Sequence, residues 1–362
     1  MHVVVATIVH HPEDARIFHR QIPALIDAGH HVTYVAPMFD PPRPDQPGLT
    51  HVEVPRATGR RRLGALRAAR AVLRRVSEGA DLTIVHDPEL LLLAHSITSP
   101  RIWDVHEDLP AQLADKAWIP RVARPLMRGP ARLVERWGAT RFALILAEDS
   151  YVDRFGVHPI VRNTPRVPAE VEPVGAERVV YLGRVSETRG AVEMVELSEH
   201  LPDGVHLHLM GPVDSTVAID AGSRSDSLTV HGFVANDAAL SRIEGALAGL
   251  SLLHDMPNYR HSLPTKILEY MARGIPVVAT PLPEARSIVE RHDCGLIVGY
   301  ADRSELADAI GRLHADADLR ARLAANGRRA AAEHYNWEID AARFVTQCDR
   351  LGRPQARNTM PL

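Results

Sequence analysis

The stretch that decides the fold is residues 263–298, LPTKILEYMARGIPVVATPLPEARSIVERHDCGLIV. Its first part has a helical period that places Ile267 and Met271 on one face. Gly274 ends that helix and the apolar run 275–279 follows as a buried strand, after which a second helix and a second strand repeat the pattern. Helices that alternate with buried strands predict a parallel sheet covered by helices.

The start of the first of these helices has the chemistry of an anion site. A helix N-terminus presents N–H groups without intrahelical acceptors, and Lys266 adds a full positive charge in the first turn. Glu269 lies deeper in the same helix, where a carboxylate can hold a ribose diol. The spacing therefore favours a nucleotide-phosphate site, although a packed helix with a solvated Lys and Glu fits the spacing equally well.

The same alternation extends in both directions and predicts an α/β protein with two doubly wound domains. The sequence TPRVPAEVEPVGAE, residues 164–177, has three prolines and little apolar periodicity, which is a linker composition. We therefore expect an N-terminal domain at 1–163, a linker at 164–177, a C-terminal domain at 178–345, and a helix end and tail at 346–362 that packs back on the N-terminal domain. The expected elements are 3–9, 16–28, 31–36, 63–76, 82–86, 102–105, 122–137, 143–147, 179–182, 191–200, 206–210, 228–230, 239–248 and 250–253, then mostly helix from 304 to 351 with a break at 333–337.

Composition places the chain among ordinary globular proteins, with 362 residues of which 45% are hydrophobic and 24% charged. The N-terminal sequence runs straight from an apolar strand into histidines and acids, which is not a signal-peptide pattern, and no apolar run is long enough to cross a membrane. The two cysteines, Cys294 and Cys348, make no disulfide framework and are expected as reduced thiols. These features predict a cytoplasmic protein.

Two stretches concentrate positive charge. Residues 56–75 contain eight arginines and no acid, and residues 116–136 contain six basic residues and one acid, with apolar residues between them. Basic amphipathic helices bind anionic membrane surfaces, so peripheral contact with the inner membrane leaflet is one interpretation and a solvated helix face is the other. Aromatic residues are only 5% and no nucleic-acid-binding motif is present, so nucleic acid is not an expected partner.

The segment YLGRVSETRG, residues 181–190, supplies further cations. Gly183 permits a tight turn after a strand, which places Arg184 at the carboxyl end of that strand and Arg189 at the start of the next helix. The first strand-to-helix turn, VHHPEDAR, contains no glycine, so a dinucleotide fingerprint is absent there. The Asp-x-Asp triplets in HADADLR, residues 314–320, are interpreted as helix-capping acids and not as a metal site.

These motifs resemble those of family 4 glycosyltransferases with the GT-B fold, in which "PxK(I/L)xEYMAxGxPVVATxxPE" recurs. The stretches 10–37, 86–94, 103–110, 161–168 and 181–190 resemble the same family in order and spacing, so the resemblance covers nearly the whole chain. It implies a GT-B, α/β fold with two Rossmann-like doubly wound domains facing a central cleft. It also implies retaining transfer of a sugar from a nucleotide-diphosphate sugar to a hydroxyl acceptor, with no metal and no cofactor.

The resemblance assigns donor-side roles residue by residue. The family's "GRxxxxKG" maps its two phosphate-binding cations onto Arg184 and Arg189, with Arg in place of the usual Lys, and both are expected to stabilise the leaving diphosphate in catalysis. Glu269 maps onto the ribose-binding carboxylate, whereas His261 stands where the family commonly has an acid, which leaves sugar recognition open. The expected donor-binding residues are Gly183, Arg184, Arg189, His231, Phe233, His261, Leu263, Pro264, Thr265, Lys266 and Glu269.

On the acceptor side, His106 follows the strand 102–105 and matches the family histidine that approaches donor sugar and acceptor, so we expect it to be catalytic. The stretch HHPED (10–14), Arg16 and HDP (86–88) follow neighbouring strands. The acceptor-side candidates are His11, Asp14, Arg16, His86, Asp87 and Glu107. We favour a same-face mechanism in which the leaving phosphate takes the acceptor proton, over a double displacement with Glu107 as the covalent nucleophile.

Two other functions stay open at this point. A GT-B sugar-nucleotide 2-epimerase would process the donor with no acceptor. A catalytically silent carbohydrate-binding or partner subunit is suggested by His261 in place of an acid, although the retained Arg184, Arg189 and Glu269 argue against it. The acceptor itself fits a lipid-linked saccharide, a glycan or a small molecule equally well.

Overall fold

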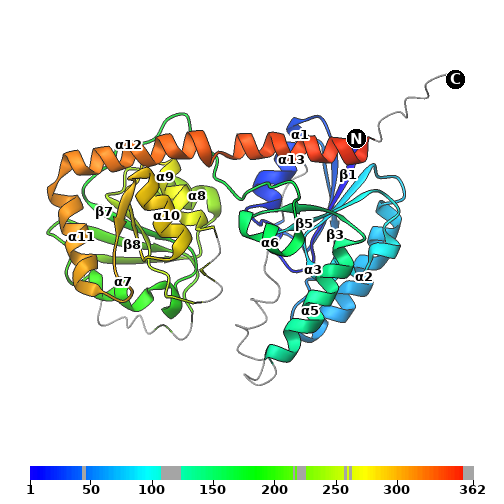
Figure 1. The fold of residues 1–362 in the computed structure, drawn as a ribbon, viewed down its shortest axis with the longest axis horizontal. Coiled ribbons are helices and arrows are strands. Elements are labelled where there is room, and N and C mark those ends of the chain that lie inside the picture. The colour runs from blue at the N-terminus through cyan, green and yellow to red at the C-terminus, as the bar shows by residue number, and fades with distance from the viewer. Residues whose placement is uncertain are drawn as a thin grey trace. The chain divides into compact units, whose positions relative to one another are not determined.

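The computed structural model describes residues 1–42, 46–106, 124–214, 217, 226–256, 259–260 and 263–353. The chain divides into two compact units, Met1–Asn163 with the chain from Glu338 onward, and Thr164–Trp337. Each unit is a parallel sheet with helices on its faces (Figure 1). The stretch expected as a linker, 164–177, clusters with the second unit, and the last helix clusters with the first because Phe344 and Cys348 are fully buried there.

The first unit contains a six-stranded sheet in the order β3-β2-β1-β4-β5-β6, and all the pairs are parallel. Its strands are β1 His2–Ala6, β2 His31–Ala36, β3 Leu49–Glu53, β4 Leu82–Val85, β5 Arg101–Val105 and β6 Ala143–Leu146. Its helices are the π-helical turn Ile17–Gln21, α1 Ile22–Asp27, α2 Arg62–Val76, α3 Pro88–Leu91, α5 Arg124–Ala139, α6 Val152–Phe155 and α13 Trp337–Gly352, with 3₁₀ turns at Gly59–Arg61, Ala94–Ser96 and Asp149–Tyr151.

The second unit repeats this architecture with the strand order β12-β11-β10-β7-β8-β9. Its strands are β7 Arg178–Leu182, β8 His206–Met210, β9 Leu228–Gly232, β10 Ala248–Ser251, β11 Val277–Ala279 and β12 Gly295–Ile297. Its helices are a 3₁₀ turn Glu187–Arg189, α7 Ala191–Leu197, α8 Asn236–Ile243, α9 Thr265–Ala272, α10 Pro283–His292, α11 Arg303–Ala315 and α12 Ala317–His334.

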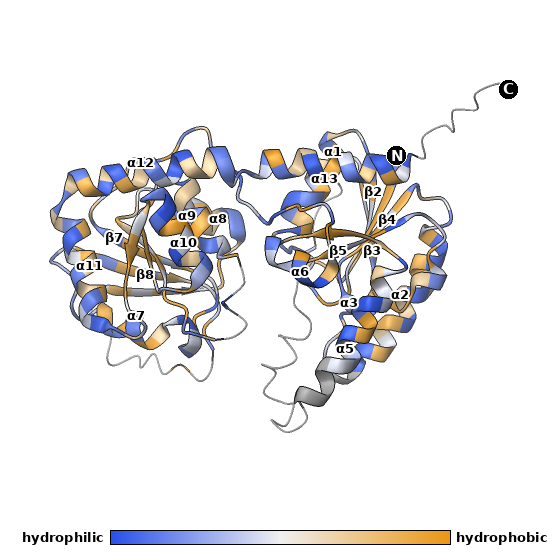
Figure 2. Cartoon of the chain, viewed as in Figure 1, coloured by the Kyte–Doolittle hydropathy of each residue, from blue (hydrophilic) through white to orange (hydrophobic). Residues whose placement is uncertain are grey.

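Hydropathy explains why the sheets form. The central strands are mostly apolar, whereas most helices mix apolar and polar residues along their length (Figure 2). A strand such as β4 is buried at all four positions, as expected for a sheet covered on both faces. Strand order reverses between β1 and β4 and between β7 and β10, and each of these places is called the switch point of its sheet. Open α/β sheets bind ligands at the carboxyl ends of the two strands that meet at a switch point.

The deciding stretch, 263–298, forms the predicted helix, strand, helix and strand as α9, β11, α10 and β12. Its first helix begins at Thr265 because Pro264 lies in a non-helical conformation as the N-cap. The predicted helix 239–248 is too long, since Gly245, with a φ of 68°, separates α8 from a strand that already starts at Ala248. Strand β3 was not predicted, because LTHVE forms an exposed edge strand without an apolar run.

Three smaller predictions are confirmed. Asp316 caps α12, because its side chain accepts a hydrogen bond from the Leu319 N–H at 2.8 Å. Cys294 and Cys348 are free and buried. The helical C-terminal region breaks between α12 and α13, inside the predicted range 333–337. Among the described residues, no helix combines the length and the apolar character needed to span a bilayer.

Candidate functional site

A cluster of cations lies at the carboxyl end of β7, where Gly183 turns the chain with a φ of 115°. A Cβ placed on Gly183 would lie 3.8 Å from Lys266 Nζ and 3.9 Å from Arg189 Nη1, so both cations border the space that the glycine leaves. The Arg189 guanidinium carbon lies 5.8 Å from the Tyr259 ring centroid. The strand end, the following turn and the start of α9 therefore converge at one point, as the sequence predicted.

Lys266 is the least satisfied charge in this cluster. Its Nζ is buried, lies 3.9 Å from the centroid of the Tyr181 ring, and has no hydrogen-bond partner within the described ranges. Burial, and after it the neighbouring Arg189, hold the pKa of Lys266 well below its ordinary value. Two basic groups lie beside a helix N-terminus, and no acid that the structure describes pairs with Lys266, so an anion would stabilise this site.

The side chain of Arg184, the other arginine of this motif, forms an ion pair with Asp214. Its guanidinium is 59% exposed and donates to Asp214 Oδ1 at 2.7 Å. Its backbone carbonyl accepts a hydrogen bond from the Tyr181 hydroxyl at 2.8 Å, which fixes the turn after β7. The two arginines of the motif therefore differ, because Arg189 borders the space at Gly183 and Arg184 forms an exposed ion pair.

Glu269 and its neighbour Tyr270 support the site from inside α9. Glu269 is 8% exposed and accepts a hydrogen bond from Arg273 Nη1 at 2.7 Å. The Tyr270 hydroxyl accepts from the Leu182 N–H at 3.0 Å and donates to the Leu250 carbonyl at 3.1 Å, so α9 is tied to both strands of the switch point. The hydrogen bond to Leu182 therefore holds the end of β7 close to α9.

The remaining donor-side candidates are spread more widely. His231 belongs to β9 and its ring stacks on His208, with the centroids 5.3 Å apart. Phe233 is 72% exposed, so it is a surface residue and not part of the core. Leu263, Pro264 and Thr265 lead into α9 as predicted. His261 lies outside the described residues.

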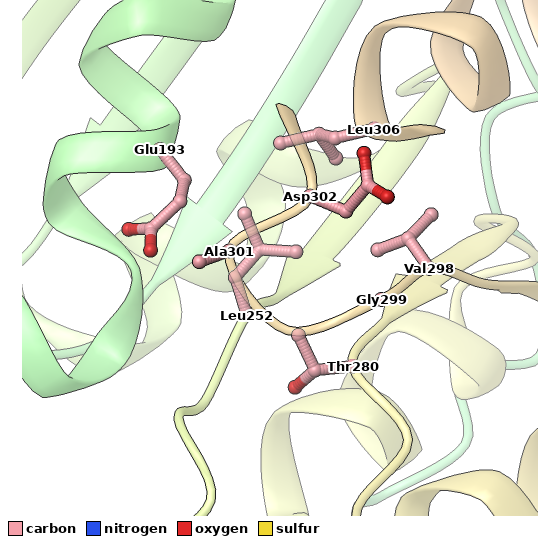
Figure 3. A pocket seen from close by; sticks show the side chains of 8 residues that line it. All are labelled: Glu193, Leu252, Thr280, Val298, Gly299, Ala301, Asp302 and Leu306. Carbon is pink, nitrogen blue, oxygen red and sulfur yellow. The ribbon is translucent and has the colours of Figure 1, made fainter. Parts of the chain in front are cut away.

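A small pocket lies beside the switch point, at the ends of β10, β11 and β12 (Figure 3). Glu193 of α7 lines it, and its Oε1 lies 2.8 Å from His254 Nε2 while Oε2 is buried with no hydrogen-bond partner in the described part of the chain. The His254 N–H also donates to the Thr188 carbonyl at 3.0 Å. The loop after β10 is therefore joined to α7 through Glu193 and, through the backbone hydrogen bond to Thr188, to the turn that carries Arg189.

In the first unit, a buried ion pair lies under the strand ends. Asp104 of β5 is fully buried and accepts from Arg16 Nε and Nη2, both at 2.7 Å, and from Gln21 Nε2 at 2.8 Å. The same guanidinium donates to the Val161 carbonyl at 2.8 Å. Burial alone would raise the pKa of Asp104, but Arg16, and after it His86, hold that pKa well below its ordinary value.

Two histidines, His10 and His106, form a pair next to this ion pair. His10 Nε2 is 3.2 Å from His106 Nε2 and 3.4 Å from Asp87 Oδ1. His106 Nδ1 lies 3.0 Å from the Asp104 carbonyl oxygen. Asp87 is fully buried and accepts from the Thr7 hydroxyl at 3.0 Å and from backbone N–H groups after β1. Burial, followed by His10, lowers the pKa of His106 to about 4.

The acceptor-side candidates therefore fall into two groups. Asp14, Arg16, His86, Asp87 and His106 converge at the carboxyl ends of β1, β4 and β5. His11 is exposed and its Nδ1 accepts from the Glu13 N–H at 3.2 Å, so it does not join this cluster. Glu107 lies outside the described residues.

Ligand atoms of His86, Asp104 and His106 lie within 4.8 Å of one another, a spacing that can fit a metal ion. The Asp104 carboxylate, however, is already held by the Arg16 guanidinium through both oxygens. A cation placed there would face a buried positive charge at close range, so we assign no metal to this cluster.

Sequence reasoning missed several residues that build the two clusters. Tyr181 and Gln21 carry no signal of their own, because a tyrosine in a buried strand and a glutamine in a helix are ordinary. His10 lay inside the stretch named as a candidate, but the direction of its side chain was not predictable. Asp104 could have been found as an acidic residue in the middle of an otherwise apolar strand.

Comparison with known proteins agrees with this geometry. Residues 176–316 match the family model described as "Glycosyl transferases group 1". A D-inositol 3-phosphate glycosyltransferase of Xylanimonas cellulosilytica is 30% identical over 204 residues, which are 50% of this chain and 47% of that protein. The chain thus spans about half the length of such curated relatives.

Solved structures resemble nearly the whole chain. Sucrose-phosphate synthase of Thermosynechococcus elongatus superposes with a TM-score of 0.71 at 18% identity, over 96% of this chain and 97% of that one. The HepE protein of Anabaena in complex with UDP-glucose gives a TM-score of 0.69 at 14% identity, over 96% and 99%. Two doubly wound parallel sheets of this kind form the GT-B fold. The chain therefore has the GT-B fold, and its residues 176–316 are similar to group 1 glycosyltransferases.

Proposed function

We propose that the chain is a retaining, metal-independent glycosyltransferase that moves a sugar from a nucleotide-diphosphate sugar to a hydroxyl acceptor. The observation that carries this proposal is the buried Lys266 Nζ beside Arg189, at the switch point of the family-matched domain. A diphosphate has the charge and the size to pair with both cations. Arg184 is a further phosphate ligand once a diphosphate competes with Asp214 for its guanidinium.

The chemistry follows from these charges. As the bond between the sugar C1 and the phosphate oxygen breaks, negative charge develops on the leaving diphosphate, and fixed cations stabilise it. The acceptor oxygen bonds to C1 from the same face and its proton passes to that phosphate oxygen, so the anomeric configuration is retained. Glu269 is proposed to hold the ribose and His106 to contact the reacting sugar or the acceptor hydroxyl.

Two buried acids of the first unit, Asp104 and Asp87, are unsuited to a double displacement, whereas Glu107 lies outside the described residues. A covalent nucleophile must be a carboxylate that can reach the sugar carbon. Both oxygens of Asp104 are engaged by Arg16, and Asp87 accepts from Thr7 and from the backbone. Neither carboxylate is available as a nucleophile, and the cations at Lys266 and Arg189 supply the charge stabilisation that a metal ion provides in other transferases.

Calorimetric titration with UDP, GDP, ADP and dTDP tests the proposal. At least one of the four is expected to bind, and Glu269→Gln is expected to weaken that binding without abolishing it. Turnover should survive EDTA, because no step depends on a metal ion. Failure of all four nucleotides to bind would refute the donor site, and an absolute requirement for Mg²⁺ would refute the metal-free mechanism. Donor turnover without any acceptor would favour the 2-epimerase, and binding without turnover the silent subunit.

We also propose that the acceptor is presented at an anionic membrane surface. Helix α2 exposes Leu63, which is 69% accessible, next to the exposed Arg67, Arg74 and Arg75. Helix α5 likewise exposes Leu133, which is 68% accessible, between the exposed Arg132 and Arg136. Apolar and basic side chains on one helix surface are the pattern of an interfacial helix. A lipid-linked saccharide is the acceptor that such contact would favour, over a soluble glycan or small molecule.

Liposome flotation is expected to reveal this contact. Each exposed basic residue near an anionic surface adds roughly 1 kcal/mol of binding free energy, so the protein should float with anionic vesicles at low salt and leave them at high salt. Changing Arg67, Arg74 and Arg75 to Glu should abolish flotation. The matched control changes Arg286, Arg291 and Arg312 of α10 and α11 to Glu and should float as before. Equal loss in both triple variants, or no flotation of the wild type, would leave α2 as a solvated helix.

A further inference from the structure

The proposed function gives a role to His106 but none to His10, the other member of the histidine pair in the first unit. The backbone carbonyl of Asp104 can only accept a hydrogen bond, so His106 Nδ1, which lies 3.0 Å from it, carries a hydrogen. In the neutral ring His106 Nε2 is then an acceptor. His10 Nε2 lies 3.2 Å from this nitrogen and is therefore the donor of the pair.

His10 Nε2 has a second acceptor within reach. Asp87 Oδ1 lies 3.4 Å from the same nitrogen, so one N–H faces both the His106 ring and a buried carboxylate. If a ligand took the place of His10 at His106 Nε2, the His10 N–H would turn to Asp87 and would not be left unsatisfied. An exchange of this kind costs little, because the number of hydrogen bonds is conserved.

We propose that His10 is a positioning residue that keeps His106 Nε2 an unprotonated hydrogen-bond acceptor and occupies, in the ligand-free protein, the place of a substrate hydroxyl. This inference rests on the proposed transferase function for the identity of the ligand, which is the hydroxyl of the acceptor or of the donor sugar. His10 itself touches no reacting atom. On binding, the substrate O–H donates to His106 Nε2, and the His10 N–H shifts to Asp87.

The surroundings of the two rings agree with this role. Burial, followed by the charge of His10, already lowers the pKa of His106 to about 4, so the ring is neutral at physiological pH. The His10 ring has Asp14 Oδ2 at 3.8 Å from its Nδ1 and Asp87 Oδ1 at 3.4 Å from its Nε2, whereas the Asp104 carboxylate near His106 is already engaged by Arg16. Among the described residues, the titratable and charged groups that face the pair are Asp14 and Arg16 after β1, His86 and Asp87 after β4, and Asp104 on β5.

The test is a nitrogen-15 NMR titration of the full-length, ligand-free protein, with the His106 signals assigned by difference from His106→Asn. In the wild type we expect Nδ1 to be protonated, Nε2 unprotonated at pH 7, and the ring to titrate near pH 4. In His10→Phe, which removes the donor and its charge, the midpoint should rise above the wild-type value but stay below about 6.5, because burial of the His106 ring remains. His10→Gln keeps an N–H donor and should titrate between the two.

Activity provides the second measurement. The acid limb of kcat/KM should move to higher pH in His10→Phe, so that the loss of activity relative to the wild type grows as the pH falls below 7, and His10→Gln should restore most of that activity. A His106 midpoint that is the same in His10→Phe as in the wild type would overturn the proposal. The NMR result does not depend on turnover, so it decides the role of His10 even if the protein transfers no sugar.

Discussion

Replacing Arg16 with methionine is expected to lower the free energy of unfolding by about 3–5 kcal/mol. Methionine fills much of the same volume but leaves the Asp104 carboxylate fully buried with its main counter-ion gone. Asp104 would keep the hydrogen bond from Gln21 Nε2, at 2.8 Å, and the contact with His86, whose Nδ1 lies 3.2 Å from Asp104 Oδ2. An uncompensated buried carboxylate is among the most destabilising single changes that a protein can carry.

The chain offers a matched control. Arg162 donates to Asp149 through the same two-pronged contact, at 2.8 and 2.7 Å, but here the carboxylate partner is 63% exposed and the arginine 26% exposed. Arg162→Met should therefore cost no more than about 1 kcal/mol. Urea unfolding followed by tryptophan fluorescence compares the two variants, since Trp103 and Trp137 lie in the first unit. Equal urea midpoints for Arg16→Met and Arg162→Met would contradict the expectation that burial of the ion pair sets the loss of stability.

A second variant separates the two parts of the cost. In the double variant Arg16→Met with Asp104→Leu both charges are gone, so much of the lost stability should return, although Val161 and Gln21 keep unsatisfied groups.

The pH dependence of the stability that this ion pair provides has a defined sign. Because Arg16 holds the folded-state pKa of Asp104 well below its unfolded value of about 3.9, the stabilisation is present above pH 4 and is lost as pH falls through the folded-state pKa.

The contrast between Arg16 and its neighbours shows what the sequence could predict. Periodicity and turn residues predicted the central strands and helices, because strands buried on both faces, such as β4, leave an unmistakable apolar run. Since parallel strands end on one edge of a sheet, that prediction also brought together the groups after β1, β4 and β5. Edge strand β3 was missed because half-exposed strands lack such a run.

Side-chain direction is what the sequence could not predict. His10 and His11 are adjacent in HHPED, yet His10 contacts His106 and His11 is exposed. Irregular backbone after a strand has no period from which to infer a direction. For the same reason the motif treated Arg184 and Arg189 as equivalent, whereas the structure pairs only Arg184 with Asp214. The sequence also did not predict that the Lys266 ammonium is buried, since a lysine in a first helical turn is usually solvated.

Replacing Lys266 with methionine is expected to reduce kcat/KM by about 10²–10³-fold and to stabilise the ligand-free protein at the same time. The two effects have one cause. The Nζ is buried, and neither Tyr181 nor any other described residue accepts a hydrogen bond from it, so the ligand-free protein bears the cost of burying the amine. A bound diphosphate would supply the missing partner, and methionine removes both the cost and the partner.

The choice of lysine supports this interpretation. Lys116 and Lys266 are the only lysines among the 42 Lys and Arg residues of the chain. An ammonium can lose its proton when it is buried, whereas a guanidinium cannot. Lys266→Arg should therefore lower the melting temperature of the ligand-free protein, where Lys266→Met raises it. The matched control is Arg184→Met, which breaks an exposed ion pair and should leave the melting temperature nearly unchanged.

The pH dependence again has a defined sign. The folded-state pKa of Lys266 lies below the value of 10.5 expected for the unfolded chain, so the unfolded state binds more protons between the two values. Stability of the ligand-free wild type should consequently rise with pH across that window, and the advantage of Lys266→Met should shrink toward pH 10.5.

Binding of a diphosphate should reverse this shift, because a nearby anion favours the charged ammonium. Calorimetry with UDP, GDP, ADP and dTDP in two buffers of different ionisation enthalpy should therefore show proton uptake with the nucleotide that binds. The uptake should disappear in Lys266→Met and persist in Arg184→Met. A Lys266→Met protein that binds the nucleotide with wild-type affinity would show that the diphosphate lies elsewhere. Loss of binding without a rise in melting temperature would show that Lys266 carries its charge at no cost in the ligand-free protein.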